Sequence, residues 1–190
     1  MDFTISARIL ISTDSFPVIG LSVLQPAPGG SLVYGQIQLT QQYFGSPLVI
    51  EGILYNLKPS TSHGLHVHET GDLSQACLSL GGHFNPHGKL HGSEKSSERH
   101  LGDLGNVLTD EFGIANIYLV IQDGSLFGAQ GWIGRSIAVS EFQDDLGENI
   151  DEGSQRSGNS GGSLACGVIG IKYPVGSLPN ENKMYDYIRQ

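Results

Sequence analysis

The chain has 190 residues, 27 of them glycine, and a formal net charge of −9 at neutral pH. This length is typical of one domain with a sizeable core, and no apolar stretch is long enough to span a membrane as a helix. The negative charge disfavours nucleic acid and anionic membranes as partners, because both repel an acidic surface. Glycine at about twice its usual share of ~7% is typical of tight turns between short strands.

From Phe16 onward the sequence consists of short apolar or alternating runs. The clearest is SLVYGQIQL, where Val33, Gly35, Ile37 and Leu39 alternate with residues that suit the opposite face of a strand. No segment has a convincing helical period. We therefore predict an all-β fold, an antiparallel sandwich or flattened barrel. Its eight predicted strands are PVIGLSVL, SLVYGQIQL, PLVIEGILYNL, GLHVHE, GIANIYLVI, SLFGA, WIGRSIAVSE and LACGVIGI.

Two long segments interrupt the strands, at about 70–101 and 141–163. Loops of this length in a compact domain are usually functional or disordered. We predict an N-terminal extension over residues 1–16, one domain over residues 17–172 and a C-terminal extension over residues 173–190. The start of the chain lacks a basic segment and a clean cleavage site, which argues against a signal peptide.

Six of the seven histidines lie between residues 64 and 106. His66 and His68 are two positions apart on a predicted strand, so both imidazoles point to one face and supply half of a copper-type nitrogen set. Because an imidazole has two nitrogens, one histidine can join two metal ions, and His83 is the candidate by position. A lone histidine is usually a surface or core residue, but six in one window favour metal binding.

A second group of candidate ligands follows in a segment rich in glycine and proline, whose turns can bring separated residues together. Three imidazoles and one carboxylate can close a tetrahedral zinc site. The members of this group are His83, His91, His100 and Asp103.

Several segments resemble the copper-zinc superoxide dismutase family: GLHVHETGD, GGHFNPHGKLHG and ERHLGDLGN, then IGRSIAVSEFQDDLG and GNSGGSLACGVIGI. The resemblance covers about residues 18–171. It implies a Greek-key β-barrel that binds copper and zinc and acts on superoxide. Cysteine spacing alone leaves Cys77 and Cys166 as a disulfide or as two free thiols, and the resemblance favours the disulfide.

The resemblance also implies roles for individual residues. It assigns copper to His66, His68 and His83, with His83 bridging both metals, and zinc to the whole second group. Asp144 matches a carboxylate that hydrogen-bonds a histidine of each metal, here His66 and His91, and such a contact fixes the tautomer and orientation of the imidazoles. Of the other histidines, His63 matches one that stabilises a loop, and His87 has no assigned role.

Two positions depart from the family pattern. Where the family has a fourth copper histidine the chain has Ser140, whose short neutral side chain is a poor copper ligand. Where the family has an arginine that docks superoxide at the mouth of the copper site, the chain has Ser163. Arg156 matches a second basic residue that guides anions, so part of the attraction for an anion is retained.

We therefore expect a metal-binding protein with zinc at an intact site, an incomplete copper site and weak or lost dismutase activity, and we assign no catalytic residue. One alternative is an active superoxide dismutase with a three-histidine copper centre. A second is a copper-delivery or docking partner, although the chain has no C-x-x-C domain and no C-x-C tail.

The resemblance bears on assembly and location as well. Family members commonly pair through a face that includes Ile133, Gly134 and residues 169–171, which favours a homodimer, whereas Thr70 replaces an aromatic residue common there. The cytoplasm is the favoured location, with secretion as the alternative.

Overall fold

The computed structural model describes residues 17–29 and 31–173. The predicted N-terminal extension lies outside the described residues, as does the predicted C-terminal extension after Tyr173. Among the described residues, no helix is long and apolar enough to cross a membrane.

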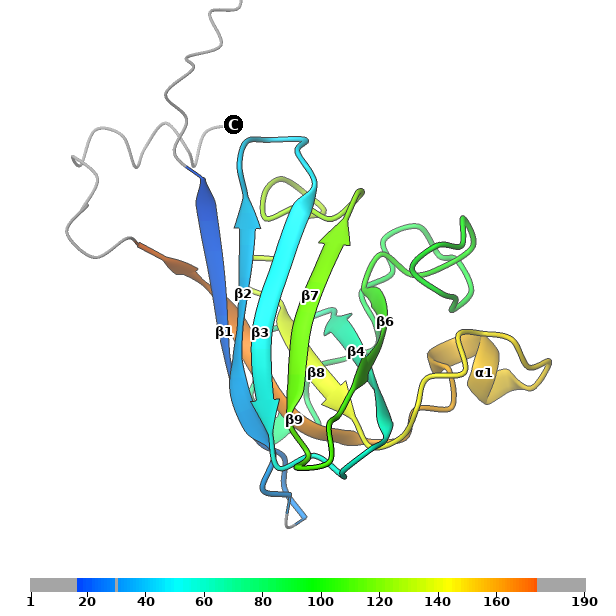
Figure 1. Cartoon of the computed structure of the whole chain (residues 1–190). Helices are drawn as coiled ribbons and strands as arrows, with labels where there is room; N and C mark the ends of the chain where they lie inside the picture. The colour runs from blue at the N-terminus through cyan, green and yellow to red at the C-terminus, as the bar shows by residue number, and fades with distance from the viewer. Residues whose placement is uncertain (1–16, 30, 174–190) are drawn as a thin grey trace, which may run out of the picture.

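Eight antiparallel strands form one sheet that curls into a nearly closed barrel (Figure 1). Neighbouring strands follow the order β6, β4, β8, β9, β1, β2, β3, β7, so the chain crosses the ends of the barrel several times. The predicted all-β barrel is confirmed. Its strands are β1 (Val18–Pro26), β2 (Tyr34–Gln41), β3 (Leu48–Tyr55), β4 (Ser62–His68), β6 (Asp103–Leu108), β7 (Ala115–Ile121), β8 (Ser136–Ser140) and β9 (Ser163–Lys172).

One predicted strand is wrong and another strand was not predicted. The segment SLFGA forms bends and a turn, and its Leu126 reaches the core from there. The eighth strand of the barrel is instead β6, whose sequence DLGNVL pairs with β4. Glycine and asparagine disfavour strands, but the burial of Leu104 and Val107 on the barrel side outweighs that preference.

Each long loop contains a short strand or helix that the periodicity of the sequence does not predict. The first loop includes β5 (Ser74–Cys77), and the second includes the helix α1 (Glu152–Ser157). Asp151 caps α1 by accepting from the Ser154 N–H, and Gly158 ends it with a left-handed φ of 67°. A helix of six residues is too short to produce a readable apolar period.

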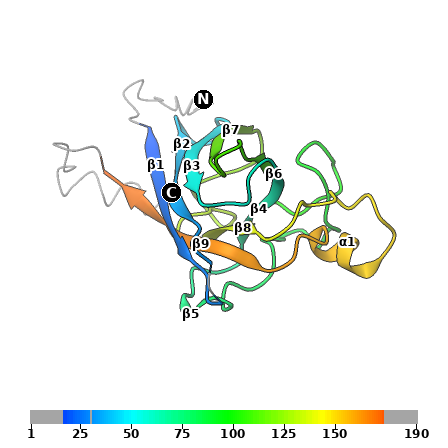
Figure 2. The same ribbon diagram turned by 60° about the horizontal axis from the view of Figure 1, so that its bottom comes forward.

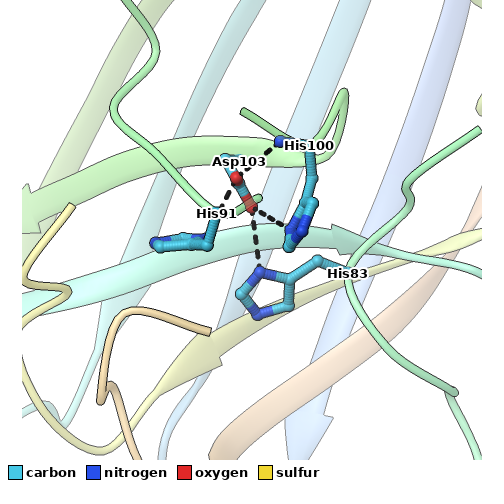
Figure 3. Close-up of side chains that lie close together, drawn as sticks. All are labelled: His83, His91, His100 and Asp103. Atoms are coloured by element: carbon cyan, nitrogen blue, oxygen red, sulfur yellow. Dashed lines mark hydrogen bonds and ion pairs between the residues drawn. The ribbon is translucent and has the colours of Figure 1, made fainter. Parts of the chain in front are cut away.

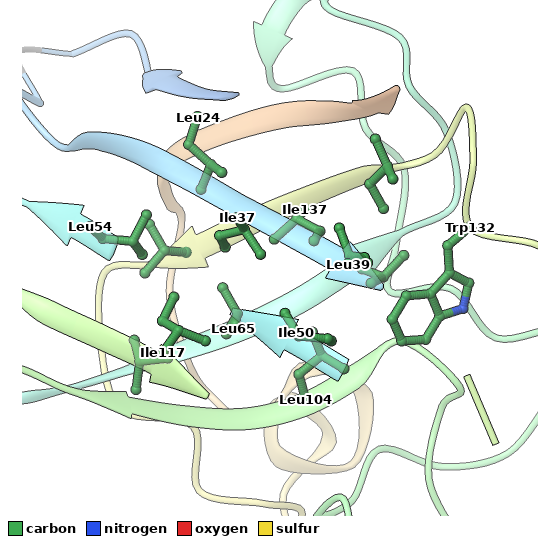
Figure 4. Packing of buried hydrophobic residues seen from close by; sticks show 14 of the residues in the cluster. Leu24, Ile37, Leu39, Ile50, Leu54, Leu65, Leu104, Ile117, Trp132 and Ile137 are labelled. Atoms are coloured by element: carbon green, nitrogen blue, oxygen red, sulfur yellow. The ribbon is translucent and has the colours of Figure 1, made fainter. Parts of the chain in front are cut away.

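The core fills the inside of the barrel (Figure 4). The alternation predicted for β2 is confirmed, because Gly35, Ile37 and Leu39 are buried while Tyr34 is exposed. Burying one such aliphatic side chain contributes about 1.5–3 kcal/mol. The fully buried Trp132, from the segment before β8, packs there with side chains from several strands, among them Leu24, Ile50, Leu54, Leu65, Leu104, Ile117 and Ile137.

A disulfide fastens the first long loop to the barrel. Cys77 at the end of β5 is bonded to Cys166 on β9, with 5.8 Å between the Cα atoms. β5 lies in contact with β9 outside the main sheet (Figure 2). The disulfide that the resemblance favoured is therefore present, and it anchors one end of the loop that carries most of the histidines.

Replacing Cys166 with Ser should lower the free energy of unfolding by about 2–4 kcal/mol, because the unfolded chain gains the freedom of an open loop. Urea unfolding at neutral pH measures the loss. Cys77→Ser is the matched control and should cost a similar amount. The double variant should cost no more than either single variant, and additive losses would contradict a role through the shared bond.

Candidate metal centre

Three chain segments carry all the candidate ligands except His91, and a triangle of backbone hydrogen bonds joins them. The Val67 N–H donates to the Gly102 carbonyl at 2.9 Å, the Gly102 N–H donates to the Phe84 carbonyl at 2.9 Å, and the Phe84 N–H donates to the Val67 carbonyl at 2.8 Å. A side chain on Gly102 would bring a Cβ within 2.9 Å of the Phe84 nitrogen, so the close approach requires glycine. The candidate ligands within two positions of these three residues are His66, His68, His83, His100 and Asp103.

The second group of candidate ligands, His83, His91, His100 and Asp103, is called the zinc-type group below. Its three histidines converge on the buried carboxylate of Asp103 (Figure 3). The Nδ1 atoms of His83 and His100 lie 2.9 and 3.2 Å from Asp103 Oδ1, and His91 Nδ1 lies 3.0 Å from Asp103 Oδ2. One potential ligand atom from each of the four residues lies within 4.8 Å of the others. The arrangement of three imidazole nitrogens and a carboxylate suits zinc.

His91 gives a physical reason for a cation in this group. Its Nε2 lies 2.7 Å from Asp144 Oδ1 and must carry the hydrogen, because a carboxylate only accepts. A neutral His91 therefore turns the Nδ1 lone pair towards Asp103 Oδ2, and this buried nitrogen has no hydrogen-bond partner. Two acceptors at 3.0 Å repel each other unless a proton or a metal ion lies between them. The residues present thus fit a bound zinc ion.

Without a metal ion, a proton on His91 relieves that repulsion. Burial lowers the pKa of His91, but hydrogen bonds and charges from Asp103 and Asp144 outweigh burial and raise the pKa to about 9. Burial raises the pKa of Asp103, yet hydrogen bonds from the three histidines bring that pKa far below its ordinary value. A divalent ion and the His91 proton therefore compete for one place.

The copper-type group, His66, His68 and His83, lies beside the zinc-type group and shares His83 with it. The rings of His66 and His83 stack with 3.8 Å between their centroids, and His68 meets His83 edge-on at 5.3 Å. Burial lowers the pKa of His68 and of His83 to about 4 and also lowers that of His66. All three imidazoles are neutral at pH 7, the form that offers a lone pair to a metal ion.

Asp144 connects the two groups. Its Oδ2 lies 2.9 Å from His66 Nε2 and its Oδ1 lies 2.7 Å from His91 Nε2, and all three side chains are buried. Burial raises the pKa of Asp144, but the hydrogen bonds from both histidines lower the pKa to about 2. The structure thus brings together the three residues that the resemblance linked.

Two residues that hold Asp144 were not predicted. The Asn106 side chain bonds the Asp144 backbone twice, accepting from its N–H and donating to its carbonyl, each at 2.8 Å. Gly158 lies against the Asp144 carboxylate, and a Cβ there would collide with it. The only sequence signal for Gly158 was its place at the end of a short polar run.

Ser140 lies inside the copper-type group. Its Oγ is 3.4 Å from His66 Nδ1, and both residues are buried. Since His66 Nε2 carries the hydrogen that bonds Asp144, Nδ1 accepts and the Ser140 hydroxyl donates. The hydroxyl therefore engages the lone pair that a metal ion at this group would need.

A pocket of about 210 Å³ opens beside these residues. Ser140 and Ser163 line it together with Arg156, whose exposed side chain forms no hydrogen bond or ion pair with the part of the chain that the structure describes. His68 and His83 also line the pocket. The two substituted positions thus meet in one cavity beside the copper-type group.

The remaining histidines have no place in either group. His63 is buried and both ring nitrogens have partners, Nδ1 at 2.9 Å from the Ser140 carbonyl and Nε2 at 2.9 Å from the Thr61 hydroxyl. These contacts agree with the loop-stabilising role that the resemblance implied. His87 is exposed and lies outside both groups.

The barrel and its histidine–aspartate groups define a metal-binding β-barrel protein. The family model described as copper/zinc superoxide dismutase matches residues 33–169. A superoxide dismutase [Cu-Zn] of Cryptococcus neoformans var. grubii is 43% identical over 143 residues, and superoxide dismutase [Cu-Zn] A of Xenopus laevis is 46% identical over 143 residues. Each match covers 75% of this chain and 93% of the relative. The chain belongs to the copper/zinc superoxide dismutase family, which implies copper and zinc as cofactors.

Changing Asp144 to Asn should weaken zinc binding about 10- to 100-fold. The amide removes the charge that supports His91, and its NH₂ group forces the histidine that it faces to move its hydrogen from Nε2 to Nδ1. Competition with a chromophoric chelator measures the affinity. Asp145→Asn is the control, because Asp145 bonds Asn149, Ser154 and Asn159 but none of the metal-type histidines. Equal losses in both variants would contradict a direct effect on the imidazoles.

The metal-free protein should be most stable near pH 6.5, which is the ordinary pKa of a histidine side chain. Because His68 and His83 have pKa values lowered to about 4, their contribution is complete above about pH 6.5 and is lost as the pH falls towards 4. Because the pKa of His91 is raised to about 9, its contribution is complete below about pH 6.5 and is lost as the pH rises through 9.

Urea unfolding between pH 4 and pH 9 tests this expectation, with a slope of about 1.4 kcal/mol per pH unit for each proton by which the two states differ. Saturating zinc should abolish the alkaline decline, since the ion takes the place of the His91 proton. A decline that zinc leaves unchanged would show that other groups cause it.

Proposed function

We propose that this chain is a zinc-binding member of the family whose copper position is incomplete and whose dismutase activity is weak or lost. The observation that carries the proposal is the Ser140 hydroxyl bonded to His66 Nδ1. In the family pattern, the corresponding position is a histidine whose imidazole binds copper. Here the side chain is too short to do so, and it occupies a lone pair of one of the three remaining histidines.

Zinc would be held by the second group of ligands, His83, His91, His100 and Asp103. The unpartnered nitrogen of His91 and the strongly lowered pKa of Asp103 support this part of the proposal. A metal ion that binds only the folded chain stabilises it by mass action. Zinc binding would therefore fix the first long loop against the barrel even without any catalytic turnover.

Copper would be held by His66, His68 and His83, and when bound it supplies the one-electron chemistry of superoxide dismutation. Copper(II) favours a tetragonal set of nitrogen ligands, and three imidazoles with a neutral hydroxyl fall short of that set. Ser163 also removes a positive charge from the mouth of the pocket. Both changes act against turnover, while the zinc-type group, the disulfide and the barrel are intact.

The alternative is an active superoxide dismutase with a three-histidine copper centre. The neutral state of His66, His68 and His83 at pH 7 favours this reading, because all three are ready to bind. Arg156 at the pocket supports it as well, since a local positive charge attracts an anionic substrate.

A dismutase assay with restored residues distinguishes the two proposals. Superoxide decay is measured for the native protein, Ser140→His, Ser163→Arg and the double variant, each loaded with copper and zinc and checked for metal content. We expect a rate near the blank for the native protein and a gain of at least about 10-fold for the double variant, because positive charge at a site mouth alone changes capture rates by ~10–10³.

A native protein that is already fast would overturn the first proposal and support the alternative. In that case His66→Ala should abolish the copper-dependent rate. If the native protein and the double variant are both inactive with full metal content, the two serines do not explain the loss.

A further inference from the structure

The outer wall of the barrel carries an apolar face. β1, β2, β3 and β7 are neighbours in the sheet, and their outward residues form three rows across these strands (Figure 1). The outward side of an antiparallel sheet that faces water is commonly polar. Here most of the outward side chains are aliphatic or aromatic, and Glu51 is the only charged one. The rows, which together are called the outer face, are Ile19, Thr40, Val49 and Val120; Leu21, Gln38, Glu51 and Tyr118; and Val23, Gln36, Ile53 and Asn116.

The apolar side chains of the outer face are open to solvent. Tyr118 is 67% exposed, Val23 50% and Val120 45%. The aliphatic residues between them are only half-buried, since each lies beside a neighbour in its row rather than under a covering element. Covering such a surface with an apolar partner is favourable, and contiguous apolar patches on a protein commonly mark interaction sites. The outer face is therefore a docking surface.

Charge limits what can cover the outer face. Glu51 lies in the middle row, and its carboxylate forms no ion pair or hydrogen bond with any other residue that the structure describes. The Lys172 ammonium reaches the margin of the face but donates to Gln38 at 2.7 Å. Two copies of the chain paired through this face would bury two unpaired carboxylates, which is costly. A partner with apolar side chains and a positive charge fits better.

We propose that the N-terminal segment of the same chain, residues 3–11, docks on the outer face. Its sequence is FTISARILI, and apolar residues occupy every odd position. The even positions are polar except for Leu10. Such alternation gives an extended segment one apolar side. Arg8 is the only charge between residues 3 and 13, and its sign is opposite to that of Glu51.

The point of attachment brings this segment to the outer face. β1 begins at Val18, and Ile19 belongs to the first row. Because β1 already pairs with β2 and with β9, a preceding segment cannot extend the sheet beside it. Asp14, Ser15 and Pro17 are residues typical of turns, so the chain can reverse before β1. Nine extended residues span ~30 Å, enough for a strand of eight residues, which is ~26 Å long.

The segment after Tyr173 is the nearest competitor. It is attached at the same end of the barrel, because Lys172 pairs with Ile19. It has no alternating apolar run of comparable length, and it contains the charged residues Glu181, Lys183, Asp186 and Arg189. Covalent attachment gives either segment an effective concentration of roughly mM, so a weak contact is sufficient. Sequence pattern and charge together favour residues 3–11.

This inference goes beyond zinc binding and is independent of both metal-type groups. The strands of the outer face, β1, β2, β3 and β7, carry none of the candidate ligands. Zinc content is measured separately from docking. A failure of docking therefore leaves the proposed zinc binding untouched, and a failure of zinc binding does not remove the outer face.

Trypsin cleavage of the full-length, zinc-loaded protein tests the proposal, because Arg8 is the only lysine or arginine before Lys58. A docked segment must leave the face before the protease binds it, so the rate follows the open population. Val120→Asp places a charge in the outer face and should accelerate cleavage after Arg8 about 10-fold, which corresponds to about 1.4 kcal/mol. Tyr118→Asn should act in the same direction and replaces Val120→Asp if that variant does not fold. Intact mass spectrometry measures the loss of residues 1–8.

Phe112→Asp is the matched control, because it adds the same charge at an apolar residue that is 74% exposed but lies outside the outer face. It should leave the cleavage rate unchanged. The alternation supplies a second control within the segment. Ile5→Asp should accelerate cleavage and Ser6→Asp should not, each measured relative to a synthetic peptide of residues 1–17 with the same substitution.

The inference is overturned if the native protein is cleaved after Arg8 as fast as the peptide, or if Val120→Asp and Phe112→Asp have equal rates. Faster cleavage after Lys183 in Val120→Asp, with no change after Arg8, would show that the C-terminal segment covers the face instead. A lower molar mass of Val120→Asp by sedimentation, again with no change after Arg8, would show that a second copy of the chain does.

Discussion

The triangle of backbone hydrogen bonds among Val67, Phe84 and Gly102 is the constraint on which the placement of five candidate ligands depends. Each of the three residues lies in a different segment, and each is adjacent to at least one candidate ligand. Backbone bonds fix these segments to within the short distances that metal ligation requires, whatever the neighbouring side chains do. Val67 lies on the barrel strand β4. The triangle therefore holds the segments around Phe84 and Gly102 in fixed positions relative to that strand.

Charge balance is the second theme of the centre. Asp103 and Asp144 place two carboxylates among buried imidazoles, and these charges are tolerable only because cations or hydrogen bonds surround them. In the zinc-type group, a protonated His91 or a bound metal ion balances the negative charge. The copper-type group is neutral, and Ser140 adds a hydroxyl rather than a ligand. The zinc-type group thus contains a carboxylate whose charge a cation would balance, whereas the imidazoles of the copper-type group are neutral.

Most of the architecture could be predicted because it follows from local patterns. Alternation identified β2, and the H-x-H spacing of His66 and His68 placed both on one strand. β6 could not be predicted, since its glycine and asparagine read as a turn and only pairing with β4 makes it a strand. The contact between Ser140 and His66 was equally invisible, because it joins residues 74 positions apart through the register of β4 and β8.

The shared carboxylate of Asp144 has a thermodynamic consequence for the two groups. If occupancy at His91 alters how firmly Asp144 holds its oxygens, it alters the orientation of His66 by the same contact. Linkage requires such an influence to be reciprocal, so a ligand at His66 must change the affinity for an ion at His91 by an equal factor. A substitution that changes the contact of Asp144 with one histidine is therefore expected to change ligand affinity at the other.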